Sequence, residues 1–131
     1  MATLKISDLS VGDWVGVRCG TKINAFKVEE IRFNNIIHKY VAILNNKAYG
    51  LPTTELHPIP ITVEILEKNG FERLLERDLF YHSESGLEVA FEDGEWMHTI
   101  NLHEYTINTI SGVHHIQHLL RVYGCEGEIN L

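Results

Sequence analysis

Three histidines fall within five positions near the end of the chain, in the segment GVHHIQHLLRVYG (112–124). An imidazole can ligate a metal ion or exchange a proton near neutral pH, and the sequence holds no stronger chemical signal. His114 and His118 lie four residues apart, a spacing at which two imidazoles on one helix can share a metal ion. The pattern lacks the glutamate of the zinc-protease motif HExxH. A third ligand would have to come from elsewhere in the chain, from His82, His98 or His103.

Helical geometry predicts where these rings point. An ideal α-helix advances about 100° per residue, which gathers the apolar residues of this segment into one arc. These residues are Ile116, Leu119, Leu120 and Tyr123, with Val113 at the edge. The three histidines fall on the opposite side. We therefore expect an apolar stripe that faces the core and histidines that face solvent or a partner. The expectation is that the protein holds no metal, with His114 and His118 as the candidates if it does.

Other catalytic signatures are missing from the sequence. No GxxxxGK[ST], GxGxxG or GxSxG segment occurs. The paired carboxylates of Glu29–Glu30 and of Glu92-Asp93-Gly94-Glu95 lie where a bulge and a hairpin tip need polar residues, so we interpret them as surface acids. Cys19 has positive charge nearby that would lower a thiol pKa, but no partner base is indicated, and a structural cysteine is favoured. We predict a protein that is not an enzyme and uses no cofactor.

Composition places the 131-residue chain among ordinary globular proteins, with 44% hydrophobic and 22% charged residues. We expect a single domain over 1–131, with one half over 1–61 and another over 62–131. The two cysteines show no disulfide framework, and no leader or membrane-spanning run is apparent, so we expect a cytoplasmic protein with no membrane association.

Charge is unevenly distributed between the halves. Residues 1–61 hold seven Lys and Arg against five acids, a balance of +2, whereas residues 62–131 hold four against thirteen, a balance of −9. In the first half, aromatic residues (Trp14, Phe26, Tyr40, Tyr49) alternate with basic ones (Arg18, Lys27, Arg32, Lys39). Such a mixture is what a nucleic-acid-binding face needs, and the four basic residues are the candidate contacts. The overall charge of −7 opposes this interpretation.

The first half has the pattern of β-structure. Val15 and Val17 indicate a strand with one buried face. Apolar residues are even-numbered at Phe26 and Val28 but odd-numbered at Ile31 and Phe33, so the alternation changes phase at Glu29–Glu30 and predicts a bulge. Residues 39–51 predict a hairpin that turns at Asn45-Asn46-Lys47. Short, bent strands of this kind predict an SH3-like barrel or a strongly curled antiparallel sheet.

The extended connector Pro58–Pro60 marks the boundary between the halves, and a short helix follows it that starts at an N-cap Thr62 and stops at Asn69–Gly70. Turn signals at 84–86 and 93–94 then predict a three-stranded meander over 79–102, with YTINTI as a further strand. The histidine segment forms the C-terminal helix, and EGEINL is expected to add an edge strand. The fold class is therefore α+β.

Two segments also resemble those of a known family. LHPIPITVEILEKNGFE and VHHIQHLLRVYG are similar to the "L-x-PIPLT-x-E-x-L-x-KNGF" stretch and terminal "VH-x-LQ" helix of small uncharacterised proteins from prophage-like and mobile regions of gut Bacteroidales genomes. The likeness runs in order along nearly the whole chain and departs at Val63 and Ile116. It implies a phage-related origin and transfers no catalytic residue. His114 and Gln117 correspond to the family's H and Q, and Gln117 is expected to bond the neighbouring sheet or Tyr105.

The sequence therefore favours a non-enzymatic interaction or accessory module of phage or mobile-element origin, with a protein partner, a second copy of the chain included. Two alternatives stay open. The first is nucleic-acid binding by the N-terminal β half, and the second is a metal-dependent enzyme that uses the late histidines.

Overall fold

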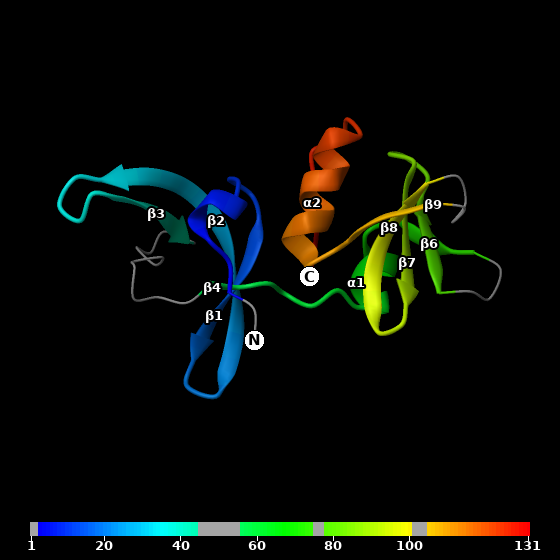
Figure 1. Ribbon diagram of the computed structural model, residues 1–131, viewed down its shortest axis with the longest axis horizontal. Coiled ribbons are helices and arrows are strands. Elements are labelled where there is room, and N and C mark those ends of the chain that lie inside the picture. Colours follow the sequence, from blue (N-terminus) through cyan, green and yellow to red (C-terminus); the bar gives the residue numbers. More distant parts are fainter. Residues whose placement is uncertain (1–2, 45–55, 75–77, 101–104) are drawn as a thin grey trace. The chain divides into compact units, whose positions relative to one another are not determined.

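The computed structural model describes residues 3–44, 56–74, 78–100 and 105–131. In these residues the chain has an α+β fold of antiparallel sheets with few helices, as predicted (Figure 1). In chain order the elements are the 3-10 helix η1 (Ile6–Asp8), β1 (Trp14–Cys19), β2 (Lys22–Asn34), β3 (Lys39–Leu44), β4 (Leu56–His57), α1 (Val63–Lys68), β5 (Phe71–Arg73), β6 (Leu79–His82), β7 (Leu87–Glu92), β8 (Glu95–Ile100), β9 (Tyr105–Thr109) and α2 (Val113–Val122).

The chain divides into two compact units, Met1–Ile59 and Pro60–Leu131, and the division falls within the proline connector. None of the described helices is long and apolar enough to cross a membrane.

The described residues of the first unit form a four-stranded antiparallel sheet with the strand order β3-β2-β1-β4. Val15 and Val17 share the buried face of β1, as predicted. The core contains Leu9, Val15, Val17, Val28, Ala42, Leu44 and Leu56. Each large side chain among these stabilises the fold by about 1.5–3 kcal/mol through the apolar surface that it removes from water.

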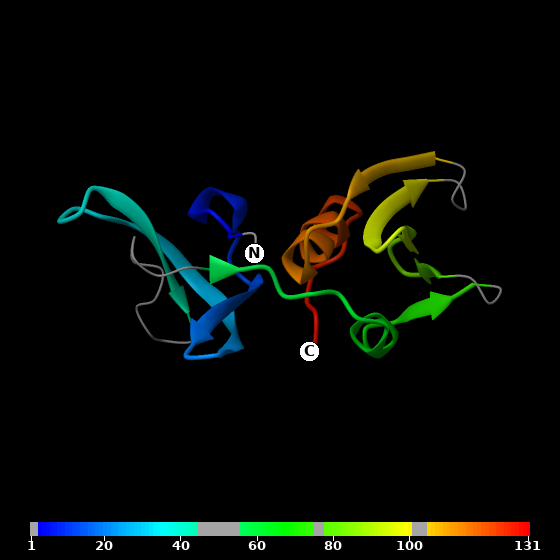
Figure 2. The same cartoon turned by 60° about the horizontal axis from the view of Figure 1, so that its bottom comes forward.

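A bulge in β2 curls this sheet. The pairing of β2 with β3 shifts by one residue between Val28 and Glu30, which confirms the bulge expected from the change of phase. One long strand thus pairs with β1 along its first half and with β3 along its second (Figure 2). In the described part of the chain, β3 and β4 are the edges and are not paired with each other, so the sheet is curled and open. The hairpin expected at Asn45-Asn46-Lys47 lies outside the described residues.

The second unit opens with α1, whose ends are the predicted ones. The Thr62 hydroxyl accepts a 3.1 Å hydrogen bond from the main-chain N–H of Ile65, which otherwise lacks a partner in the first turn. Asn69 follows the last helical residue, and Gly70 has φ +85°, a left-handed conformation that glycine adopts without steric cost. Leu66 is the buried residue that holds this short helix against its unit.

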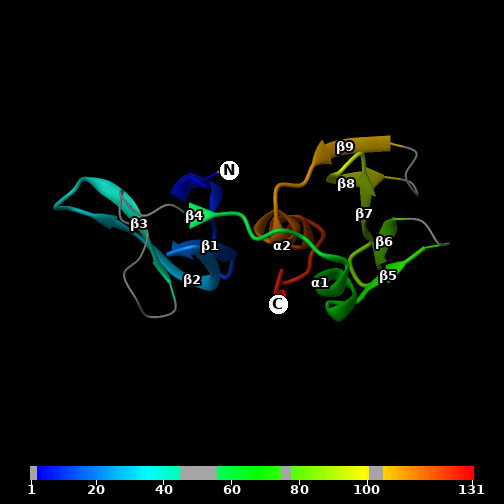
Figure 3. The same ribbon diagram turned by 90° about the horizontal axis from the view of Figure 1, so that it is seen from below.

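In the described part of this unit, the second sheet contains five antiparallel strands in sequential order, from β5 to β9. The predicted meander corresponds to β6, β7 and β8, and YTINTI contains β9. The three-residue strand β5 was not predicted. It pairs with β6 along Phe71–Arg73, and Phe71 is its buried residue. Figure 3 shows the strands arranged in an arc, with α1 and α2 on its inner side.

The last residues do not form the expected edge strand, and residues 126–131 lack regular secondary structure. Side chains hold this tail instead. The amide of Asn69 donates a 2.7 Å hydrogen bond to the carbonyl of Asn130 and accepts one of 2.7 Å from its N–H. Ile129 is buried. An amide that both donates and accepts replaces the pairing that a neighbouring strand would supply.

Candidate functional site

Helix α2 buries a different face from the one that the apolar pattern predicted. Val113, Ile116 and Leu120 are buried as expected, but Leu119 is half-buried and Tyr123 is exposed. Gln117 and His114 are buried instead, and His114 is only 4% exposed. The buried face is therefore rotated about the helix axis toward the histidines. The rotation is about two-thirds of the 100° that separates consecutive residues. The expectation that all three imidazoles face solvent is wrong for His114, whereas His115 and His118 are half-buried.

Gln117 explains part of the rotation. Its side-chain nitrogen donates a 2.9 Å hydrogen bond to the carbonyl oxygen of Gly127 in the tail. A buried amide is costly unless its polar atoms have partners. The tail supplies one from ten residues further on, a partner that the sequence did not indicate. The glutamine can consequently lie on the core side of the helix. His114, which lies one turn earlier on the same side, is buried with it.

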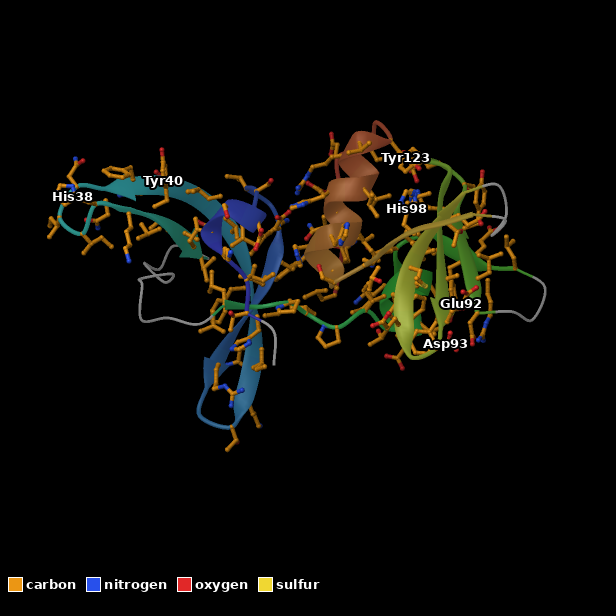
Figure 4. The ribbon with its side chains drawn as sticks, in the orientation of Figure 1. His38, Tyr40, Glu92, Asp93, His98 and Tyr123 are labelled. Carbon is orange, nitrogen blue, oxygen red and sulfur yellow. The ribbon has the colours of Figure 1, made fainter. Side chains whose placement is uncertain are left out.

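The histidine rings next to α2 form a loose group with β8. His98 is buried, and its Nε2 lies 3.0 Å from the hydroxyl of Tyr123, with which it shares a hydrogen bond (Figure 4). Burial lowers the pKa of His98 below the usual 6.5, and the Glu88 carboxylate only partly opposes this. Burial also lowers the pKa of His115, and the charges of His118 and His98 lower it further. These surroundings favour the neutral imidazole at neutral pH.

His114 and His118, the two candidate metal ligands, lie near each other on α2. The His114 and His118 rings have centroids 5.8 Å apart and planes at 87° to each other. Among the described residues, no group of three or more His, Cys, Asp or Glu side chains is placed to hold a metal ion. His103 lies outside those residues. Of the other candidate third ligands, His98 bonds Tyr123, and His82 bonds the Ser85 hydroxyl at 2.7 Å.

The four candidate nucleic-acid contacts do not gather in one place. Arg18 lies near the turn between β1 and β2, whereas Arg32 and Lys39 lie near the turn between β2 and β3, at the other end of the long strand. Lys27 is between them, with its ammonium 5.9 Å from the centre of the Trp14 ring. Arg32 forms a two-point ion pair with Glu30, with bonds of 3.1 and 2.8 Å. The carboxylate offsets much of the charge that a phosphate would bind.

An apolar surface at the far end of β2 and β3 was not predicted. Phe33 and Tyr40 face each other across the two strands, with ring centroids 5.2 Å apart in an edge-to-face arrangement. Ile36 lies in the turn and is 89% exposed, while Tyr40 is 61% and Phe33 45% exposed. We call Phe33, Ile36 and Tyr40 the contact ribbon. The same alternation carries Ile31 and Ala42 toward the core, so the pattern of the sequence does not separate these buried residues from the exposed ones.

The turn of the contact ribbon has a defined structure. The Asn34 side-chain oxygen accepts hydrogen bonds from the main-chain N–H groups of Ile36 (2.9 Å) and Ile37 (3.3 Å). His38 has φ +55°, which closes the turn (Figure 4). Asparagine commonly forms turns of this type, because its short side chain replaces a main-chain acceptor. The turn therefore presents Ile36 to solvent at the end of the hairpin.

Described residues of the second unit line two of its grooves. One, of 540 Å³, is mostly polar and lies beside the end of α2; its lining includes Lys68, Asn69, His82, Glu84, Cys125, Glu126 and Glu128. The other, of 390 Å³, lies beside the turn between β7 and β8, and its lining includes Pro60, Ile61, Phe91, Glu95, Trp96 and Ile110. We call the second one the aromatic groove.

The aromatic groove has a fixed floor. The Phe91 and Trp96 rings lie 5.0 Å apart, and the Trp96 indole N–H donates a 3.1 Å hydrogen bond to the carbonyl of Ile61. Phe91 is 39% exposed. Figure 4 shows Glu92 and Asp93 at this end of the second sheet, with His98 and Tyr123 at the other end.

Comparison with known proteins found no family model that matches the chain, no similar curated protein and no similar solved structure.

Proposed function

We propose that this chain is a non-enzymatic interaction module that binds a protein partner through the contact ribbon. The observation that carries this proposal is the exposure of Phe33, Ile36 and Tyr40 on a hairpin with a fixed turn. Neighbouring apolar side chains exposed in this way are typical of interaction sites, because leaving them in water brings the isolated chain no benefit. A hairpin whose turn is held by hydrogen bonds loses less conformational entropy on binding than an irregular loop does.

The histidines give less support to an enzyme. His98 and Tyr123 satisfy each other with a hydrogen bond, and the half-buried His115 has a pKa lowered by burial and by its neighbours. A general base needs a substrate cavity within hydrogen-bond reach. His82 lines the polar groove beside the end of α2, and its Nδ1 bonds Ser85 within its own turn.

A role in a phage or mobile element forms the second part of the proposal. It rests on the resemblance of the PIPIT, KNGF and VHHIQ segments to the prophage-like family. An accessory protein of such an element would bind other products of the same element. Co-purification with proteins encoded beside it, and its loss when Ile36 is replaced, would support this role.

The test of the module places a photo-activated cross-linking amino acid at position 36 in cells that express the chain. The matched control carries it at Thr21, an exposed position in the turn at the other end of β2. We expect a specific protein adduct from position 36 only. The identified partner, once purified, should bind at least about tenfold more weakly to the double variant Ile36→Ser/Tyr40→Ser. Val11→Ser removes another exposed apolar residue and should leave affinity unchanged.

Two results would overturn the proposal. The first is identical adducts from both positions, together with equal affinities for all variants. The second is turnover of a substrate that one point substitution at His98 or His115 abolishes while the fold is retained. Nucleic-acid binding is the competing outcome. It would appear as a gel shift at low salt that Lys39→Gln and Arg18→Gln weaken and that added salt removes.

A further inference from the structure

Side chains at α1 and α2 bind main-chain atoms along the tail, residues 126–131. From α2, the side-chain nitrogen of Gln117 donates a buried 2.9 Å hydrogen bond to the carbonyl oxygen of Gly127. At the end of α1, Asn69 binds both the N–H and the carbonyl oxygen of Asn130, each at 2.7 Å. Every residue carries a main-chain oxygen, so bonds of this kind do not depend on the side chains of the segment that is bound.

Exposed and buried residues alternate along the tail, as they do along an extended chain. Glu126, Glu128 and Asn130 are exposed, whereas Gly127 and Ile129 are buried. A side chain does not fit at position 127, because a Cβ atom there would lie 2.7 Å from a main-chain oxygen of α2. Ile129 is 3% exposed. The tail is thus recognised at two positions, a glycine and an aliphatic residue two positions later.

Open space remains beside the exposed side chains of the tail. The polar groove of 540 Å³ is lined by Glu126, Glu128 and Asn130 together with Lys68 and His82. A bound segment with larger side chains at these three tail positions would therefore find room. The requirement for particular residues is confined to the two buried positions.

We infer that α1 and α2 form a peptide-binding site and that the chain's own tail occupies it. The ligand class is an extended peptide with a glycine and, two positions later, an aliphatic residue. The residues of this site are not those of the contact ribbon, so the inference goes beyond the proposed function. Because the tail is linked to α2, its effective concentration at the site is on the order of millimolar. A second peptide must therefore displace the tail in order to bind.

A full-length variant whose own tail fits poorly tests the inference. The tail variant is Gly127→Ala/Ile129→Ser, which changes both recognised positions and keeps Asn69 and Gln117. The probe is the fluorescently labelled peptide EGEINL, the sequence of residues 126–131. Fluorescence anisotropy should show saturable binding to the tail variant, at least about tenfold tighter than to the wild type, in which the intact tail competes. Saturating peptide should also raise the Tm of the tail variant toward that of the wild type.

Altered peptides and a matched pair of substitutions are the controls. The peptides EAEINL and EGESNL change the glycine and the isoleucine, and each should bind the tail variant at least about tenfold more weakly than EGEINL. EGEIAL should bind like EGEINL, because Asn69 binds only the main chain of Asn130. Asn69→Ala in the tail variant should remove the binding, whereas Val122→Ala, at an exposed position on α2, should leave it unchanged.

Circular dichroism and urea unfolding check that each variant is folded, and Ile129→Ser alone replaces the double variant if the latter does not fold. The wild type gives a measurement that needs no variant. In the isotope-labelled wild type, EGEINL in excess over the effective concentration of the tail should shift the amide signals of Gly127 and Asn130, and EAEINL should leave them in place.

Three results would overturn the inference. The first is a folded tail variant that binds no EGEINL at millimolar concentration. The second is equal binding of all four peptides, or binding that Asn69→Ala leaves unchanged. The third is a wild type whose Gly127 and Asn130 signals stay in place in excess EGEINL. None of these results bears on the contact ribbon, whose test uses position 36.

Discussion

The side chain of Gln117 and the main-chain oxygen of Gly127 are joined by a buried hydrogen bond of 2.9 Å, ten residues apart in the sequence. Gly127 has φ +76°, and a Cβ atom at this position would lie 2.7 Å from the main-chain oxygen of Gln117. The tail thus passes so close to α2 that position 127 accepts only a glycine. This contact fixes both the path of the tail and the face that the helix buries.

Gly127→Ala should therefore destabilise the protein more than a substitution at a glycine with a similar conformation and open space. Gly124, with φ +90° and no atom within 4 Å of the place that a Cβ would occupy, is the matched control. We expect Gly124→Ala to cost about 1 kcal/mol from the left-handed backbone alone. Gly127→Ala should cost about 3 kcal/mol, because the overlap adds to the backbone cost. Urea unfolding measures both, and equal losses would contradict the close approach.

The orientation of α2 can be tested with substitutions at two positions in its last turn. Leu120 is buried, whereas Val122 is 79% exposed. Leu120→Ala should lower the free energy of unfolding by about 2–5 kcal/mol, because it leaves a cavity in the core. Val122→Ala should change it by less than about 0.5 kcal/mol. Thermal and urea denaturation provide the comparison, and similar losses at the two positions would show that the helix is turned differently.

The tail anchor at Asn69 gives another matched pair. The Asn69 side chain bonds the main chain of Asn130 twice and also donates a 2.7 Å bond to the carbonyl of Ile65. Asn69→Ala should cost about 1–2 kcal/mol, because these groups lose their partner. Asn130→Ala keeps the main-chain groups and should cost less than about 0.5 kcal/mol. Hydrogen exchange at the Asn130 amide should quicken in the first variant only.

Stability should fall on acidification because of His98. Burial lowers the pKa of His98 in the folded protein below its unfolded value of 6.5. Between these two pKa values the unfolded state binds more protons than the folded state. The free energy of unfolding therefore keeps its whole contribution from His98 above about pH 7 and decreases as the pH falls through 6.5 and below. Unfolding curves at about pH 7.5, 6.5 and 5.5 measure this change. His98→Gln should weaken this dependence, and the part that remains belongs to His115, whose pKa burial also lowers.

Local signals predicted much of the fold. The bulge in β2 followed from one change in alternation, and the ends of α1 followed from Thr62 and Asn69–Gly70, because these features depend on neighbouring residues alone. The same is true of the meander, whose turns at 84–86 and 93–94 mark its strands.

Features that depend on distant partners could not be predicted in this way. The buried face of α2 depends on Gly127, which satisfies Gln117 from the tail. The tail in turn depends on Asn69, which lies 61 residues before Asn130. The contact ribbon was missed for the opposite reason. Phe33 and Tyr40 continue a pattern that is correct for Ile31 and Ala42, and the sequence does not indicate where the interior ends.

The bulge in β2 also has a consequence for engineering. Glu29 is the extra residue, because Val28 pairs with Leu44 while Glu30 pairs with Ile43. Deleting Glu29 would leave Val28 and Ile31 on their present side in an uninterrupted zigzag, so the variant should still fold. A straightened strand would, however, carry the aromatic tip in a new direction. The main chain at Glu29 thus sets the direction in which the hairpin points. Deleting this one residue would redirect the hairpin without changing any side chain at its tip.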